Sequence, residues 1–197
     1  YTTLFRSNGN GYDDAWVEEA EKRGLYNLKS TPDALPYSVK PENIALFERQ
    51  HVLNKEEVLS RYEINMEEYT KIINIEALTM LDMAKKDILP SVSRFTKTLL
   101  ETISSKKALG IDASYEEGFV QKISSKLKEA YTALEDLDSK TKTFSEIEDF
   151  EKAAFYVRDE IIPAMDALRE PCDVMETLTD ASEWPFPTYG KLLYGIM

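Results

Sequence analysis

The stretch NKEEVLSRYEINMEEYTKIINIEALTMLDMAKKDILPSVSRF, residues 54–95, decides the fold of this 197-residue chain. Asn54 and Glu57 have the spacing of a helix capping box, in which each side chain accepts from the other residue's backbone N–H. Beyond them, apolar or small residues recur at steps of three or four: Tyr62, Met66, Tyr69, Ile73, Ala77, Met80, Ala84 and Ile88. These steps predict one long helix with a continuous apolar edge.

Two later segments carry the same signals. The second begins at Ser114 with Glu117 at the capping-box position, and the third begins at Ser145 with Glu148. Their apolar seams are Val120, Ile123, Leu127, Ala130, Leu134 and Leu137, and then Ile147, Phe150, Ala154, Val157, Ile161, Ala164 and Leu168. Three seams with a period near 3.5 predict an all-α protein, an antiparallel bundle of three to four long helices.

Prolines interrupt two of these seams. Pro90 either kinks the first long helix or divides it into two, because proline lacks the N–H that a helix interior requires. Pro163 and Pro171 lie inside the third segment and are expected to bend it. No segment alternates apolar and polar residues for long enough to predict a strand.

Composition divides the chain into four parts. Residues 1–7, YTTLFRS, back-translate to a widely used sequencing-library adapter, and we expect them to be a translated artefact. Residues 8–53 should hold short helices and a proline-rich arm, residues 54–180 the helical bundle, and residues 181–197 an aromatic C-terminal strap. We therefore expect a fragment of a longer reading frame, with its biological sequence beginning near residue 8.

The two flanking parts carry local signals of their own. Asp13 or Asp14 should cap a short helix that Gly24 ends in the left-handed conformation. The prolines of NLKSTPDALPYSVKP (27–41) are expected to keep this arm extended over the surface, and Pro41 suits the first turn of another short helix. The strap WPFPTYGKLLYGIM (184–197) should lie across a groove, because its aromatic side chains are costly to leave in water.

Composition and charge restrict the functional class. The chain is 43% hydrophobic and 30% charged, which is typical of a globular protein, and no stretch has the ~18 uncharged apolar residues of a membrane span. Its net charge of −12 disfavours nucleic-acid or anionic-membrane partners. The single cysteine, Cys172, excludes an internal disulfide framework, and a reducing intracellular compartment is expected.

The candidate sites each have a plain structural interpretation that we favour. The NGNGY stretch (8–12) lacks the third glycine of a dinucleotide-binding loop and reads as a turn. His51 has no partner pattern for a triad or a metal site, so a solvated or helix-end histidine is expected. Glu170 and Asp173 flank Cys172 and should raise the pKa of its thiol, which favours inert packing.

Carboxylates and aromatic residues beside the seams also have plain structural interpretations. Glu76, Asp82 and Asp87 border the first seam, where a carboxylate usually pairs with Lys or Arg at the bundle rim. Aromatic residues at helical spacing are expected in the core or an interface; they are Tyr62, Tyr69, Tyr131, Phe150, Phe155 and Tyr156. No residue is therefore assigned a catalytic, cofactor-binding or metal-binding role.

Three stretches nevertheless resemble one enzyme family. WVEEAEKRGLYNLKSTPDALP (16–36), INIEALTMLDMAKKDILPSVSRF (73–95) and WPFPTYGKLL (184–193) are similar to the C-terminal region of type III glutamine synthetases. The resemblance covers residues 8–196 and is least distinctive between residues 102 and 145.

The resemblance implies a ligase that joins glutamate and ammonia through γ-glutamyl phosphate, using ATP and Mg²⁺. It also implies a large oligomer of stacked rings in the cytoplasm, or in a plastid if the source is an alga. The family's metal-binding carboxylates and nucleotide-binding segment belong to a catalytic sheet upstream of residue 8. None of those motifs occurs here, so we expect no cofactor bound by this chain and no synthetase activity from it alone.

Two hypotheses for the chain follow. In the first, it is the structural C-terminal module of that ligase, and the arm (30–41) and the strap pack against the catalytic domain or neighbouring subunits of a homo-oligomer. In the second, it is a free-standing helical interaction module whose groove binds a partner helix. A catalytic sheet encoded in frame upstream would favour the first.

Overall fold

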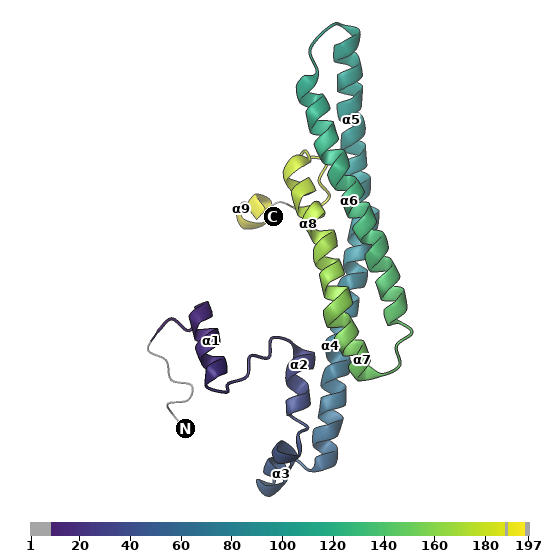
Figure 1. Ribbon diagram of the computed structural model, residues 1–197. Coiled ribbons are helices and arrows are strands. Elements are labelled where there is room, and N and C mark those ends of the chain that lie inside the picture. Colours follow the sequence, from purple (N-terminus) through teal and green to yellow (C-terminus); the bar gives the residue numbers. More distant parts are fainter. Residues whose placement is uncertain (1–8, 188, 196–197) are drawn as a thin grey trace. The chain divides into compact units, whose positions relative to one another are not determined.

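The computed structural model describes residues 9–187 and 189–195, and these contain helices and no strand (Figure 1). The α-helices are α1 (Asp14–Lys22), α2 (Thr31–Ala34), α3 (Pro41–Arg49), α4 (Lys55–Met83), α5 (Leu89–Ala108), α6 (Ser114–Phe144), α7 (Phe150–Tyr156), α8 (Ile162–Leu178) and α9 (Tyr189–Tyr194). A 3₁₀ turn, η1 (Leu35–Tyr37), and two π-helical turns, η2 (Ala84–Ile88) and η3 (Val157–Ile161), connect some of them. The chain forms two compact units that meet within α4, at residues 66 and 67.

The capping box predicted at the start of the first long helix is present. The backbone N–H of Asn54 donates to Glu57 Oε2 at 2.8 Å, and the N–H of Glu57 donates to Asn54 Oδ1 at 2.9 Å. Two N–H groups that have no carbonyl partner within the helix are thereby satisfied. Helix α4 begins at Lys55 for this reason.

The second unit is built around α6, which packs along both α5 and α8 (Figure 1). Its core contains completely buried side chains from each of these elements, including Val92, Ile123, Leu137 and Leu168. Every residue of the three predicted seams is buried or half-buried. The predicted all-α bundle of long helices is therefore confirmed.

The prolines change the helix type without ending the helix. The helical segment runs unbroken for 54 residues, through α4, η2 and α5, so Pro90 does not divide it. Pro163 follows η3 within a second unbroken segment of 29 residues, α7–η3–α8. A π-turn inserts one extra residue into the helix, and this relieves the clash between a proline ring and the preceding turn. Pro171 is buried inside α8.

The predicted start of the third segment at Ser145 is wrong. Ser145 is the last residue associated with α6, and its hydroxyl donates to the carbonyl of Lys142 at 2.6 Å. The next helix, α7, begins at Phe150, and Asp149 Oδ1 caps it by accepting from the N–H of Lys152 at 2.8 Å. Both residue types cap helices well, and here Asp149 caps the N-terminus while Ser145 terminates α6.

The expectation of an extended arm is also wrong. Residues 30–41 form α2 and η1 and then lead into α3, because each proline occupies the first turn of a short helix. The hydroxyl of Ser30 accepts from the N–H of Asp33 and caps α2. Asp13 caps α1, and Gly24 follows it with a φ of +75°, both as predicted.

The C-terminal strap is partly packed and partly helical. Trp184 and Phe186 are half-buried against the core of the second unit, so the aromatic part does lie on the bundle. Residues 189–194 form α9, a short helix that the sequence analysis did not predict. Residues 1–8, and with them the predicted adapter segment, lie outside the described residues.

We expect Leu137→Ala to lower the free energy of unfolding by about 3 kcal/mol, because Leu137 is fully buried between α6 and its neighbours and truncation leaves a cavity. The matched control is Leu109→Ala, which should change stability by less than about 0.5 kcal/mol, since Leu109 is 76% exposed. Urea denaturation of the 197-residue chain measures both. Equal losses would contradict the assigned core.

We expect Trp184→Ala to destabilise the chain by about 2 kcal/mol, less than the cost for a fully buried Trp, because Trp184 is half-buried against the core. Thermal unfolding, followed by far-ultraviolet circular dichroism, measures this loss. A variant with the same melting temperature as the parent chain would show that this side chain does not anchor the strap.

Candidate functional site

The two π-turns are the irregular features of the long helices. Each ends two residues before a proline: η2 before Pro90 and η3 before Pro163. The N–H of Leu89 donates to the carbonyl of Ala84, and the N–H of Ile162 donates to that of Val157, as the wider turn requires. Single π-turns inside α-helices are frequent at functional sites. The surroundings of both turns are therefore the first place to look for a site.

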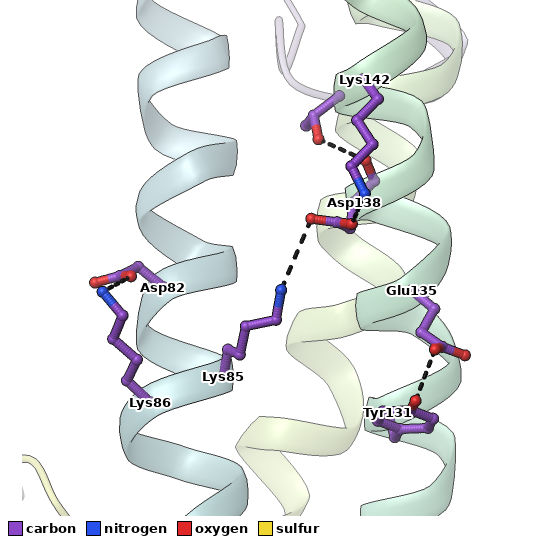
Figure 2. A network of polar contacts seen from close by, with 8 residues as sticks. Asp82, Lys85, Lys86, Tyr131, Glu135, Asp138 and Lys142 are labelled. Atoms are coloured by element: carbon purple, nitrogen blue, oxygen red, sulfur yellow. Dashed lines mark hydrogen bonds and ion pairs between the residues drawn. The ribbon is translucent and has the colours of Figure 1, made fainter.

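Helix α6 is connected to both π-turns by ion pairs. The ammonium of Lys85, in η2, lies 3.9 Å from Asp138 Oδ1 on α6, and Figure 2 shows this side chain reaching across between the two helices. Lys140, also on α6, lies 3.2 Å from Glu160 Oε2 in η3 and 3.1 Å from Asp136 Oδ2 on its own helix. Helix α6 thus pairs with η2 through its carboxylate Asp138 and with η3 through its ammonium group Lys140.

The ionised forms of these groups are favoured. The hydrogen bond from Lys142 is the main cause that lowers the pKa of Asp138, with smaller contributions from the charges of Lys142 and Lys85. The hydrogen bonds to Asp136 and then Glu160 raise the pKa of Lys140. A general acid or base needs a pKa near the working pH. These shifts move the pKa values of Asp138 and Lys140 further from neutral pH. The network therefore braces the helices and is poorly suited to proton transfer.

A shallow groove lies beside this network, between α6 and the segment where η2 continues into α5. It has a volume of about 570 Å³, and its lining combines apolar side chains with hydroxyl and ammonium groups. We call it the η2–α6 groove, and its lining residues are Lys85, Leu89, Pro90, Ser93, Ser124, Leu127, Lys128, Tyr131 and Leu134. The hydroxyl of Tyr131 donates to Glu135 Oε1 at 2.7 Å, which raises the pKa of the Tyr131 phenol (Figure 2).

A second groove lies on the other side of η2, between α4 and α8. It has a volume of about 450 Å³, and most of its lining is apolar. We call it the α4–α8 groove; it is lined by Ile75, Glu76, Thr79, Met80, Met83, Ala84, Ile88, Met165, Leu168, Arg169, Cys172 and Asp173. Ala84 and Ile88 face this groove, whereas Lys85 and Leu89 face the η2–α6 groove, so the π-turn separates the two.

Cys172 lies in the wall of the α4–α8 groove and is buried. Burial is the main cause that raises the pKa of its thiol to about 11, and the charge of Asp173 adds to it. A nucleophilic cysteine needs its thiolate form near neutral pH. This thiol is therefore unsuited to nucleophilic catalysis, in agreement with the predicted inert packing.

The carboxylates singled out in the sequence are separated in the structure. Glu76 lies at the rim of the α4–α8 groove, and Asp82 pairs with Lys86 one turn further along the same helical segment (Figure 2). The hydrogen bond from Asp82 is the main cause that raises the pKa of Lys86. Asp87 lies within η2 and its negative charge also favours protonated Lys86. The rim pairing predicted for these carboxylates is present at Asp82.

The other sequence candidates have ordinary surroundings. His51 is exposed after α3 and has a φ of +53°, which is a helix-end position. Asn10 Oδ1 accepts from the N–H of Tyr12 at 3.1 Å, so the described part of NGNGY forms a turn. Across residues 9–187 and 189–195, no group of three or more His, Cys, Asp or Glu side chains is arranged to hold a metal ion. No helix in this part of the chain is both long and apolar enough to span a bilayer.

Sequence reasoning missed both grooves and both π-turns. A usable signal was present, because KKDILP (85–90) and RDEIIP (158–163) share charged residues followed by two aliphatic residues and a proline. That pattern could have suggested two equivalent irregular turns. The grooves had no such signal, since their walls come from segments far apart in the chain, about 90 residues for the α4–α8 groove and about 40 for the η2–α6 groove.

Comparison with known proteins identifies related sequences over almost the whole chain. A family model described as the glutamine synthetase C-terminal domain matches residues 3–107, just over half of the chain. The matched range begins within residues 1–7, whose assignment to an adapter stays a prediction.

Three curated relatives align with nearly all of the chain. A glutamine synthetase of Butyrivibrio fibrisolvens is 40% identical over 191 residues, which is 96% of this chain and 27% of that protein. A glutamine synthetase of Bacteroides fragilis is 27% identical over 195 residues, again 96% of this chain and 27% of the relative. A type-3 glutamine synthetase of Dictyostelium discoideum is 29% identical over 194 residues, 95% of this chain and 26% of the relative. The chain thus spans about a quarter of the length of these relatives.

We expect Cys172 of the folded chain to react with iodoacetamide at pH 8 about a hundredfold more slowly than an ordinary thiol, because its pKa is raised to about 11. The chain unfolded in urea is the control and should react at the ordinary rate. The thiol has a lower pKa in the unfolded chain than in the folded chain. Its ionisation should therefore lower the free energy of unfolding as the pH rises from about 9 to about 11. Equal alkylation rates in the two states would contradict the assigned burial.

Proposed function

Because the chain belongs to the glutamine synthetase C-terminal domain family, we propose that it is the C-terminal helical domain of a type III glutamine synthetase. In this proposal the whole enzyme is an ATP-dependent ligase that joins glutamate and ammonia in nitrogen assimilation. The described domain has a structural or oligomer-interface role in it and makes no glutamine alone. The observation that carries the proposal is the alignment over 96% of this chain with a glutamine synthetase that is about four times as long.

The distribution of metal-binding side chains supports a non-catalytic role. Transfer of a phosphoryl group from ATP requires carboxylates that converge on Mg²⁺ ions, and such sites are held on rigid elements. The described residues have no such cluster, and the carboxylates at the grooves are separated or paired with lysine. The residues present therefore do not fit an ATP–Mg²⁺ site, and we assign none of them a step in the ligase reaction. We propose that other segments of the enzyme bind ATP and Mg²⁺.

The N-terminal part of the chain supports a role in contacts with a partner surface. Between residues 9 and 53, Pro32 is the single buried residue, although this part is rich in aromatic and aliphatic side chains. Tyr12, Tyr26 and Val52 are largely exposed, and Val17 and Leu46 are 42% exposed. Short helices without a core of their own gain most of their stability from packing against something else. We propose that the catalytic domain or a neighbouring subunit of a homo-oligomer provides that surface.

The proposed organisation follows the four parts defined from the sequence. In this proposal residues 8–53 connect to the catalytic domain, residues 54–180 form the bundle, and residues 181–197 contain the C-terminal strap; the assignment of residues 1–7 to a translated adapter stays a prediction. We propose a cytoplasmic location for the enzyme.

A chimeric enzyme tests the proposal. Residues 8–197 replace the aligned segment of the Butyrivibrio fibrisolvens relative, which shares 40% identity with them. We expect the chimera to form ATP-dependent glutamine and to assemble like its parent, because the domain supplies matching packing surfaces. The 197-residue chain alone should form none. Activity is measured by glutamine formation and assembly by sedimentation.

The control chimera carries an unrelated helical bundle of the same length in place of this segment. It should lose both assembly and activity. If the control performs as well as the chimera with residues 8–197, the domain has no specific structural role. Glutamine formation by the isolated chain would contradict the assignment of catalysis to other segments.

A further inference from the structure

The η2–α6 groove differs from the α4–α8 groove in the charges of its lining. It is lined by Lys85 and Lys128 and by no Asp or Glu, whereas Glu76 and Asp173 line the α4–α8 groove. Its lining is thus opposite in sign to the chain as a whole, which has a net charge of −12. A volume of about 570 Å³ and a mainly apolar lining with a few polar groups are typical of small-molecule sites. The groove therefore suits a small anion with an apolar body.

The polar groups at one end of the groove already have partners. The ammonium of Lys85 lies 3.9 Å from Asp138 Oδ1, and the hydroxyl of Tyr131 donates to Glu135 Oε1 at 2.7 Å. Figure 2 shows both side chains directed toward these carboxylates. A bound anion at this end would be repelled by two negative charges. The charged group of a ligand is therefore expected at the other end.

The polar groups at the other end are available to a ligand. Because α5 and α6 run antiparallel, Ser93 and Ser124 lie at the end of the groove opposite those carboxylates, and Lys128 is one turn from Ser124. These two hydroxyls and this ammonium have no hydrogen-bond or ion-pair partner among residues 9–187 and 189–195. The hydroxyls of Thr96 and Thr102, in contrast, donate to the carbonyl four residues earlier. The end near Ser124 thus offers donors for a carboxylate.

We propose that the η2–α6 groove binds an aliphatic monocarboxylate. The carboxylate accepts hydrogen bonds from Lys128, Ser93 and Ser124, and the aliphatic chain covers Leu89 and Leu127. Within the lining, Lys128 is the lysine without a carboxylate partner in the described part of the chain, so a single negative charge is matched. Residues 85–93 extend for about 12 Å at 1.5 Å per residue, which suits a chain of roughly ten carbons. This binding site goes beyond the proposed function and does not depend on it.

A nuclear magnetic resonance titration of the ¹⁵N-labelled 197-residue chain with decanoate tests the proposal. We expect saturable changes in the backbone amide signals, largest at residues 89–93 and 124–131. Hexanoate should bind at least about tenfold more weakly, because a shorter chain covers less apolar surface. 1-Decanol should also bind about tenfold more weakly, because it has the chain of decanoate and no negative charge.

Two variants of α6 form a matched pair for the charged contact. Lys128→Gln should weaken decanoate binding about fivefold, because it removes the ammonium that pairs with the carboxylate. Lys122→Gln removes the same charge from an exposed position on α6 outside the groove and should change the affinity less than about twofold. Ser124→Ala removes one hydroxyl donor and should weaken binding about threefold. The amide spectrum of each variant without decanoate establishes that it is folded.

Three results would overturn the proposal. The first is the absence of saturable signal changes at the groove residues. The second is equal affinity for decanoate and 1-decanol, which would show that the charge is not recognised. The third is an equal loss of affinity in Lys128→Gln and Lys122→Gln, which would show a general attraction between decanoate and the lysines of α6. This titration measures no glutamine formation, so its outcome is independent of that of the chimera.

Discussion

The structure depends on the burial of α6 against two partners at once. Its seam contacts α5 on one side and α8 on the other, and Ile123, Leu137 and Leu168 are completely removed from water there. Removal of apolar surface from water is the main favourable contribution to folding, and it grows with the area buried. Close packing makes this burial specific to one arrangement of the helices. The loops around Gly110 and Asp149 are short because α6 must return alongside each partner. Without this helix, α5 and α8 would each lose the surface that covers their apolar edges.

The two prolines are accommodated within this packed arrangement by a change of helix type. A proline in a regular helix interior removes a hydrogen bond and clashes with the preceding turn, at a cost of about 3 kcal/mol. Here η2 and η3 widen the helix just ahead of Pro90 and Pro163, and the long segments continue. The same turns present Lys85 and Glu160 to α6, where Asp138 and Lys140 pair with them. Irregular backbone and interhelical ion pairs therefore occur at the same level of the bundle.

The chemistry of the ionisable groups agrees with the structural role that we propose for this domain. Its ionisable groups near the π-turns are shifted toward their charged forms, and its buried thiol is shifted toward the neutral form. Neither kind of shift produces a group that exchanges protons near neutral pH. What the domain does offer is apolar surface, in two grooves beside η2 and on the short helices at both ends of the chain. The chain belongs to the glutamine synthetase C-terminal domain family, and its relatives are about four times as long. The remaining segments of such an enzyme are among the partners that we propose for the apolar surface of the short N-terminal helices.

The sequence by itself determined the long helices and their buried edges. Capping at Asn54, the left-handed Gly24 and the seams ending at Ile88, Leu137 and Leu168 depend on local chemistry, and local chemistry can be read from neighbouring residues. The start of the third segment was predicted wrongly at Ser145, because the N-cap, Asp149, depends on where α6 stops packing. The arm showed the same limit: its prolines are compatible with extended chain and with the first turn of a helix. Only the tertiary structure decided that Pro90 follows a π-turn and that Glu76 shares a groove with Cys172. Those outcomes depend on contacts between segments far apart in the chain, which a local pattern does not contain.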